Sequence, residues 1–159
     1  MNQYQKIISV IITVIFTSSC GFVLEEQAYS SEYINSYGID FISIAPNSLL
    51  SQEMRRLIEL SEFMPNDSGE GLRINIRDEA LNEEIFTLSL NNLPTEYEIT
   101  YTVSFEVLLQ GRVVRSLDTI TLSRVYGFDL NNLIAKQRES LQIQRELARG
   151  LADRILQQL

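Results

Sequence analysis

The chain carries few side chains that could perform covalent or acid–base chemistry. It has 159 residues, a single cysteine at position 20 and no histidine. A lone thiol cannot form an internal disulfide, and without histidine the usual cysteine–histidine catalytic pair is unavailable. A serine–lysine mechanism also finds little support, because Lys136 is the one lysine after Cys20 and no glycine-framed serine lies near it in the sequence. We therefore expect a protein that is not an enzyme and that needs no cofactor or metal ion.

The position of Cys20 suggests a different use for its thiol. Residues 7–16 read IISVIITVIF, a length typical of a signal-peptide core and too short to cross a bilayer as a helix, which takes about 20 residues. Two serines then precede Cys20, and this pattern resembles the lipobox of bacterial lipoproteins, in which the cysteine is acylated and the bond before it is cut. The resemblance implies a lipid anchor, with an outer-membrane address facing the periplasm because Gly21 follows the cysteine. A transmembrane anchor or an ordinary cleaved signal is the alternative.

These features divide the chain into three parts. We expect a lipoprotein signal peptide at 1–19, a lipidated N-terminus and tether at 20–37, and a single domain at 38–159, which suits one hydrophobic core by its length. The net charge is −8, and it becomes −9 once Lys6 leaves with the signal peptide. Binding to nucleic acid through a basic surface is therefore not expected, and an anionic ligand would need a local cluster of basic side chains.

The strongest pattern in the domain predicts a long β-strand at 97–109. Apolar and aromatic residues alternate with threonine, serine and glutamate, so one face of the strand should be buried and the other wet, as in a mostly antiparallel sheet. The residues expected on the buried face are Tyr97, Ile99, Tyr101, Val103, Phe105, Val107 and Leu109. A turn at Gln110-Gly111 should lead into the next strand, at 113–128.

Shorter patterns predict the remaining elements. A strand is expected at 38–46 and a helix, capped by Asn47 or Ser48, at 48–63. Another strand should begin at Leu72 and resume at 85–90 after an acidic interruption. The last segment, 132–159, should form a helix whose apolar stripe lies on the sheet: Leu147, Leu151, Ile155 and Leu159. This order predicts an α+β fold with two helices packed on one face of a four-stranded, mostly antiparallel sheet.

The chain resembles LptE, a family of lipopolysaccharide-assembly lipoproteins, over nearly its whole length and most strongly over residues 95–159. Cys20-Gly21-Phe22 with Leu24 resembles that family's mature start. The resemblance rests on an ordered set: Glu96-Tyr97, Gly111-Arg112, Arg124, Tyr126, Ala135-Lys136 and Glu139. It implies two helices on a four-stranded sheet and a function without catalysis. It also implies a partner, the outer-membrane β-barrel LptD, which the protein would plug while the two insert lipopolysaccharide into the outer leaflet.

The resemblance further implies that lipopolysaccharide binds at basic residues near one end of the sheet. One such position carries over to Lys136, expected in the loop that enters the last helix. The other, an arginine before the Glu-Tyr pair, has no counterpart, because residues 89–97 read SLNNLPTEY. Arg112 and Arg138 are candidate substitutes, since we expect both close to loops at or near Lys136. Such cations can hold lipid A phosphates by charge-assisted hydrogen bonds.

Other interpretations stay open. Lys136 and Arg138 could simply form a solvated helix start. The whole protein could instead be a periplasmic lipoprotein that carries a lipid in an apolar cavity of its own, although both helices are needed to cover the sheet. The plug interpretation draws support from the threonine- and serine-rich face of the strand at 97–109, since barrel lumens are polar.

Overall fold

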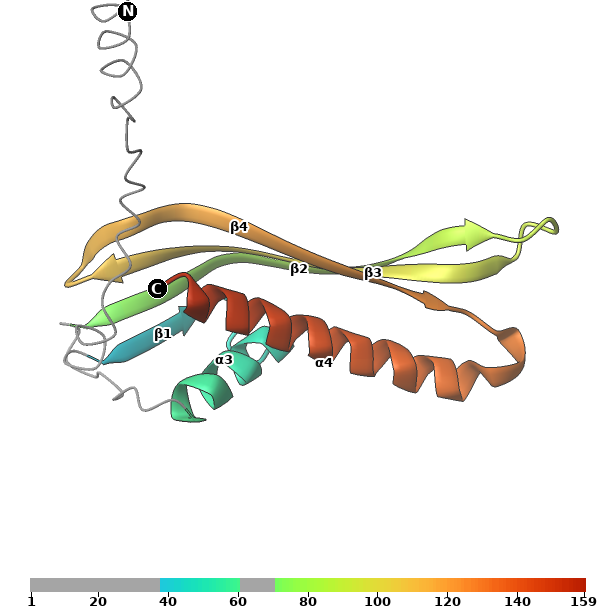
Figure 1. Ribbon diagram of the computed structural model, residues 1–159, viewed down its shortest axis with the longest axis horizontal. Helices are drawn as coiled ribbons and strands as arrows, with labels where there is room; N and C mark the ends of the chain where they lie inside the picture. The colour runs from blue at the N-terminus through green and yellow to red at the C-terminus, as the bar shows by residue number, and fades with distance from the viewer. Residues whose placement is uncertain (1–37, 61–70) are drawn as a thin grey trace, which may run out of the picture.

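The computed structural model describes residues 38–60 and 71–159 (Figure 1). The elements follow in the predicted order of strand, helix, three strands and helix, with one 3₁₀ turn before the last helix. They are β1 (Ile39–Ser43), α3 (Leu49–Leu60), β2 (Leu72–Leu88), β3 (Pro94–Leu109), β4 (Arg112–Gly127), η1 (Leu130–Asn132) and α4 (Leu133–Gln157). The signal peptide, Cys20 and the tether fall outside the described residues.

The strands form one sheet in the order β1-β2-β3-β4. β1 and β2 are parallel, because α3 carries the chain back between them, and the other neighbours are antiparallel. Both helices lie on the same side of the sheet, with α4 running along its length (Figure 1). The predicted α+β fold is therefore confirmed, and the sheet is mixed but mostly antiparallel.

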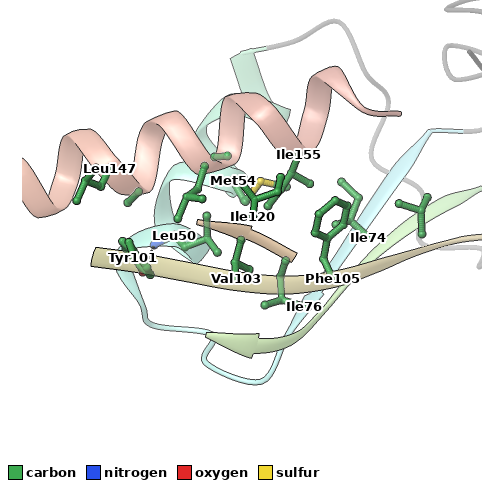
Figure 2. Close-up of a cluster of buried hydrophobic side chains, with 14 of the residues drawn as sticks. Leu50, Met54, Ile74, Ile76, Tyr101, Val103, Phe105, Ile120, Leu147 and Ile155 are labelled. Carbon is green, nitrogen blue, oxygen red and sulfur yellow. Dashed lines mark hydrogen bonds between the residues drawn. The ribbon is translucent and has the colours of Figure 1, made fainter. Parts of the chain in front are cut away.

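The core lies between the helices and one half of the sheet (Figure 2). β3 provides its centre, since alternate residues from Ile99 to Val107 are buried as the sequence predicts. α3 and α4 add their apolar stripes from the other side. The large apolar side chains that are at most 1% exposed are Leu50, Met54, Ile74, Ile76, Ile99, Tyr101, Val103, Phe105, Leu151 and Ile155.

The expected acidic interruption of β2 is wrong, because the strand is continuous from Leu72 to Leu88. The ladder with β3 instead contains a bulge at Arg77: Ile76 pairs with Phe105, and Asp78 pairs with Ser104. One extra residue exchanges the two faces of a strand. From this bulge as far as Ile85 the odd-numbered residues therefore face the helices, and Glu79 and Glu83 find hydrogen-bond partners on that side.

The connections between the helices and strands agree with the predictions from the sequence, with small differences. Gln110 (φ 50°) and Gly111 (φ 76°) form the two-residue turn between β3 and β4, and positive φ at both central positions is the type I′ geometry that suits a hairpin. Ser48 caps α3, as its Oγ accepts the N–H of Ser51 at 3.1 Å. β1 is shorter than predicted and stops at Ser43, where the side-chain oxygen accepts the N–H of Ala45 at 3.1 Å.

Candidate functional site

Lys136 lies in the first turn of α4 and not in a loop as expected. The chain needs no loop there because η1 runs directly into α4, and the Asp129 side chain begins this turn by accepting the N–H of Asn131 at 2.9 Å. The Lys136 Nζ lies 2.8 Å from Glu139 Oε2, and the lysine side chain is 24% exposed. Lys136 is thus a half-buried cation whose only partner among the described residues is a surface carboxylate.

An open pocket of about 320 Å³ lies beside Lys136. Its lining residues come from β2, α4 and the end of β4: Glu83, Tyr126, Phe128, Leu133, Lys136, Gln137 and Ser140. The lining combines a cation, a carboxylate, amide and hydroxyl groups, and apolar and aromatic surface. Such a wall can contact both the charged and the apolar part of an amphiphilic molecule.

The two candidate arginines lie in different places. Arg138 is exposed on the same end of α4 as Lys136. Arg112 begins β4, whereas α4 starts just after β4 ends at Gly127. At about 3.3 Å per residue the strand separates Arg112 from the end that carries Lys136 by about 50 Å. The expectation that Arg112 lies near Lys136 is therefore wrong, because β4 runs the full length of the sheet between them.

A second feature of this end, a hydrogen-bond network around Glu83, could not be read from the sequence directly. The Tyr126 hydroxyl donates to Glu83, and Ser140 Oγ donates to the other carboxylate oxygen at 3.1 Å. Burial, and then the adjacent Glu83 carboxylate, raises the pKa of Tyr126 to about 12. The phenol therefore stays protonated at neutral pH and joins β2, β4 and α4 around the pocket.

Four residues earlier on β2, Glu79 forms a similar pair with a tyrosine. The Tyr101 hydroxyl donates to Glu79 and accepts the N–H of Leu50, in the first turn of α3, at 3.3 Å. Burial, followed by the hydrogen bond to Glu79, raises the pKa of Tyr101. The sequence holds only a partial signal for these pairs. The apolar alternation at even positions (Leu72, Ile74, Ile76) stops at Arg77, but Phe86 and Leu88 are again apolar at even positions, so the residues alone do not locate the bulge that turns Glu79 and Glu83 inward.

The same end of the molecule exposes apolar side chains. The β2–β3 hairpin projects beyond the core (Figure 1), and Leu90 at its tip is fully exposed. We call this surface the apolar end; it comprises Ile85, Phe86, Leu88, Leu90, Leu93, Leu133 and Ile134, all at least 49% exposed. A group of large exposed apolar residues is typical of a surface that contacts another molecule.

The described residues offer little for other chemistry. Within 38–60 and 71–159, no three His, Cys, Asp or Glu side chains are grouped so that they could hold a metal ion. No helix in that part of the chain has the length and apolar character needed to span a membrane. The site is therefore an open, amphiphilic surface at the N-terminal end of α4.

Solved structures share this fold. The rare lipoprotein B of Shewanella oneidensis is 25% identical, with a TM-score of 0.65 over 75% of this chain and 90% of that one. A lipoprotein B from Nitrosomonas europaea is 20% identical, with a TM-score of 0.65 over 76% and 79%. A minor lipoprotein from Acinetobacter baumannii is 18% identical, with a TM-score of 0.64 over 76% and 87%. No curated protein matches the chain.

The family models give a direct assignment for the domain. Residues 38–159, which contain the sheet, both helices and the amphiphilic pocket, match the family described as "LptE: Lipopolysaccharide-assembly". The order of elements, the long terminal helix and the related lipoprotein structures agree with this match. The chain therefore belongs to the LptE family of lipopolysaccharide-assembly proteins.

Proposed function

We propose that this chain is a non-catalytic outer-membrane lipoprotein. It plugs and helps assemble an LptD-like β-barrel and binds lipopolysaccharide during insertion into the outer leaflet. The observation that carries the ligand part is the position of Lys136 at the end that also exposes the apolar side chains. Lipopolysaccharide presents phosphates beside acyl chains, so its recognition needs a cation next to apolar surface.

In the proposed complex, a lipid A phosphate replaces Glu139 as the partner of Lys136. The Lys136–Glu139 pair is a surface ion pair, and such pairs contribute only about 0–1 kcal/mol, so exchanging it costs little. Arg138 is exposed nearby and is the second cation we include. Arg112 is left out because it lies at the opposite end of β4.

The face of the sheet away from the helices supports the plug role. Hydroxyl pairs cross it from β3 to β4: Thr102 and Thr121 lie 3.0 Å apart, and Ser104 and Thr119 lie 2.8 Å apart. This surface is polar, as a barrel lumen requires. A lipid-carrying protein with its own cavity is less well supported, because fully buried side chains fill the space between helices and sheet.

The membrane anchor is proposed at Cys20, where acylation would hold the protein on the periplasmic side of the outer membrane. Mass measurement of the chain from membranes should find lipid on Cys20 and no residues 1–19. The plug role predicts that a large β-barrel protein co-purifies with it in mild detergent at one-to-one stoichiometry. An unlipidated chain that keeps residues 1–19, or a chain without a barrel, would contradict the respective proposal.

The ligand role is tested by the affinity of the purified full-length chain for lipopolysaccharide, compared with Lys136→Asp at two salt concentrations. Hydrogen bonds to charged groups contribute about 1.5–3 kcal/mol, so affinity should fall by about tenfold to a hundredfold. Arg112→Asp is the matched control, with the same change of charge at the far end of β4, and should change affinity by less than about threefold. Equal affinity of wild type and a folded Lys136→Asp variant would remove Lys136 from the site but leave the plug proposal intact.

A further inference from the structure

Three arginines form a row along the exposed side of α4. Arg138, Arg145 and Arg149 are all exposed, and they follow one another at spacings of seven and four residues. These spacings are close to two turns and one turn of a helix, so the three side chains share one side of it, in a row about 16 Å long. The buried residues Ile143 and Leu147 belong to the core on the opposite side of α4. We call the three arginines the arginine row.

The helix places like charges next to each other within this row. On a helix the neighbours of Arg145 are the residues three and four positions away, which are Leu141, Gln142, Ala148 and Arg149. None of them is acidic, and Arg149 repeats the positive charge one turn further on. Like charges at this spacing disfavour a helix. An anionic group bound between the two guanidiniums would remove this repulsion.

The carboxylates of α4 do not neutralise the arginine row. Glu139 pairs with Lys136, and Glu146 pairs with Arg124 on β4. Asp153 is half-buried, and in the described part of the chain it forms no ion pair, as is also true of the arginine row. The row is therefore a set of exposed cations that still require counter-charges.

Charge and position together indicate the chemistry of the ligand. Residues 129–159 contain five basic and four acidic side chains, whereas the rest of the chain contains eight basic and 17 acidic ones. Arginine binds phosphate and carboxylate groups through pairs of parallel hydrogen bonds. The row begins at Arg138, at the same end of α4 as Lys136. A polyanionic molecule bound at that end can therefore continue along the row.

We propose that Arg145 and Arg149 bind carboxylates and phosphates of the sugar core of lipopolysaccharide. The inference rests on the proposed function, in which Lys136 and Arg138 bind the phosphates of lipid A. The core sugars follow lipid A in the molecule and carry further anionic groups, so they match the cations that follow Arg138 on α4. The helix would then orient the ligand, with the acyl chains at the apolar end and the core sugars toward the C-terminal end of α4.

An acidic protein surface fits the arginine row less well. Between Arg138 and Arg149, the only large apolar side chain with substantial exposure is Leu141, at 45%. Protein interfaces usually bury an apolar centre that is depleted in charge, whereas this surface has charges along its middle. Sugar carboxylates and phosphates need only the guanidiniums and no apolar centre.

The test measures the affinity of the purified full-length chain for two ligands, lipid A and lipopolysaccharide that has the complete sugar core but no O-antigen. The double variant Arg145→Gln/Arg149→Gln should bind the core-bearing ligand at least about tenfold more weakly than wild type does. Added salt should reduce this difference. The affinity of the same variant for lipid A should stay within about twofold of wild type, whereas Lys136→Asp should weaken the binding of both ligands.

A matched control removes the same charge elsewhere. Arg112→Gln/Arg154→Gln changes the first residue of β4 and the last turn of α4, and should leave both affinities within about twofold of wild type. Equal losses in the two double variants, or equal losses for the two ligands in Arg145→Gln/Arg149→Gln, would overturn the proposal.

Other outcomes assign the arginine row to a different contact. Unchanged lipopolysaccharide affinity with reduced co-purification of a barrel would assign the row to an acidic protein surface. A fall of more than about 4 °C in the melting temperature of Arg145→Gln/Arg149→Gln would assign it to a contact within the chain. Either result would overturn the proposal. Failure of wild type to bind lipid A would contradict the proposed function itself, whereas unchanged affinity of this variant for the core-bearing ligand contradicts only the present inference.

Discussion

The two halves of the sheet differ in how the helices cover them. In the first half of β2, the side chains of Leu72, Ile74 and Ile76 are buried under α3 and α4. From Leu81 to Leu88 every residue of the same strand is exposed. α3 has no counterpart over this second half, where only the beginning of α4 accompanies the strands (Figure 1). We call these the closed half and the open half.

This difference separates stability from contact with other molecules. The closed half contains most of the fully buried side chains, and hydrophobic burial is the main favourable term in folding. The open half keeps its strands paired by backbone hydrogen bonds but leaves Lys136 and the apolar end available. The β2–β3 hairpin is anchored by the packed closed half, so it can contact a partner molecule without disrupting the hydrophobic core.

The largest expected effect is the loss of Phe105 from the closed half. Phe105 is 0% exposed, so Phe105→Ala should reduce the free energy of unfolding by about 3–5 kcal/mol, measured by urea denaturation. Thr102→Ala, on the wet face of the same strand, should cost less than about 1 kcal/mol, since it loses one exposed cross-strand hydroxyl contact. Similar losses at both positions would contradict the assigned faces of β3.

The buried phenols allow a closer comparison of the halves. Tyr101→Phe leaves both Glu79 and the Leu50 N–H without this partner, and should cost about 1–3 kcal/mol because unsatisfied buried groups are expensive. Tyr126→Phe should cost less, about 0.5–1.5 kcal/mol, because Glu83 is exposed and keeps Ser140 as a donor. Thermal or urea unfolding would measure both variants. A larger loss for Tyr126→Phe would reverse the ranking of the two halves.

Alkaline pH should weaken the open half through Tyr126. The pKa of this phenol is raised from 10 to about 12 in the folded protein, so the unfolded chain loses the proton first. Its contribution to stability is fully present below pH 10 and is lost as pH rises from 10 to about 12. The free energy of unfolding of Tyr126→Phe should therefore fall less steeply over this range than that of wild type. Parallel curves would show that Tyr126 has no raised pKa.

The smallest effect on stability is expected at the tip of the hairpin. Leu90 is fully exposed, so Leu90→Ser should change the free energy of unfolding by no more than about 0.5 kcal/mol. If the apolar end contacts acyl chains as proposed, the same variant should still weaken lipopolysaccharide binding severalfold, since each buried CH₂ contributes about 0.8 kcal/mol. Marked destabilisation, or unchanged binding, would break the distinction between the halves.

The sequence by itself determined the order of the elements and the faces of β3. Period-two alternation over residues 97–109 and the four-residue spacing of Leu147, Leu151 and Ile155 are local patterns, so each can be read along the chain without knowledge of its neighbours. The family resemblance followed from the same stretch. The turn at Gln110-Gly111 could also be predicted from the sequence, because glycine favours the positive φ that a two-residue hairpin turn requires.

Only the tertiary structure decided which charged residues share a surface. Glu79 and Glu83 face the helices because a single-residue bulge at Arg77 reverses the faces of β2, and the bulge is defined by pairing with a strand far along the chain. Arg112 and Lys136 are separated because β4 runs the whole length of the sheet. Lys136 meets Tyr126 and Glu83 at one pocket because α4 turns back along the sheet. Such proximity depends on pairing and packing between distant segments, which local residue preferences do not encode.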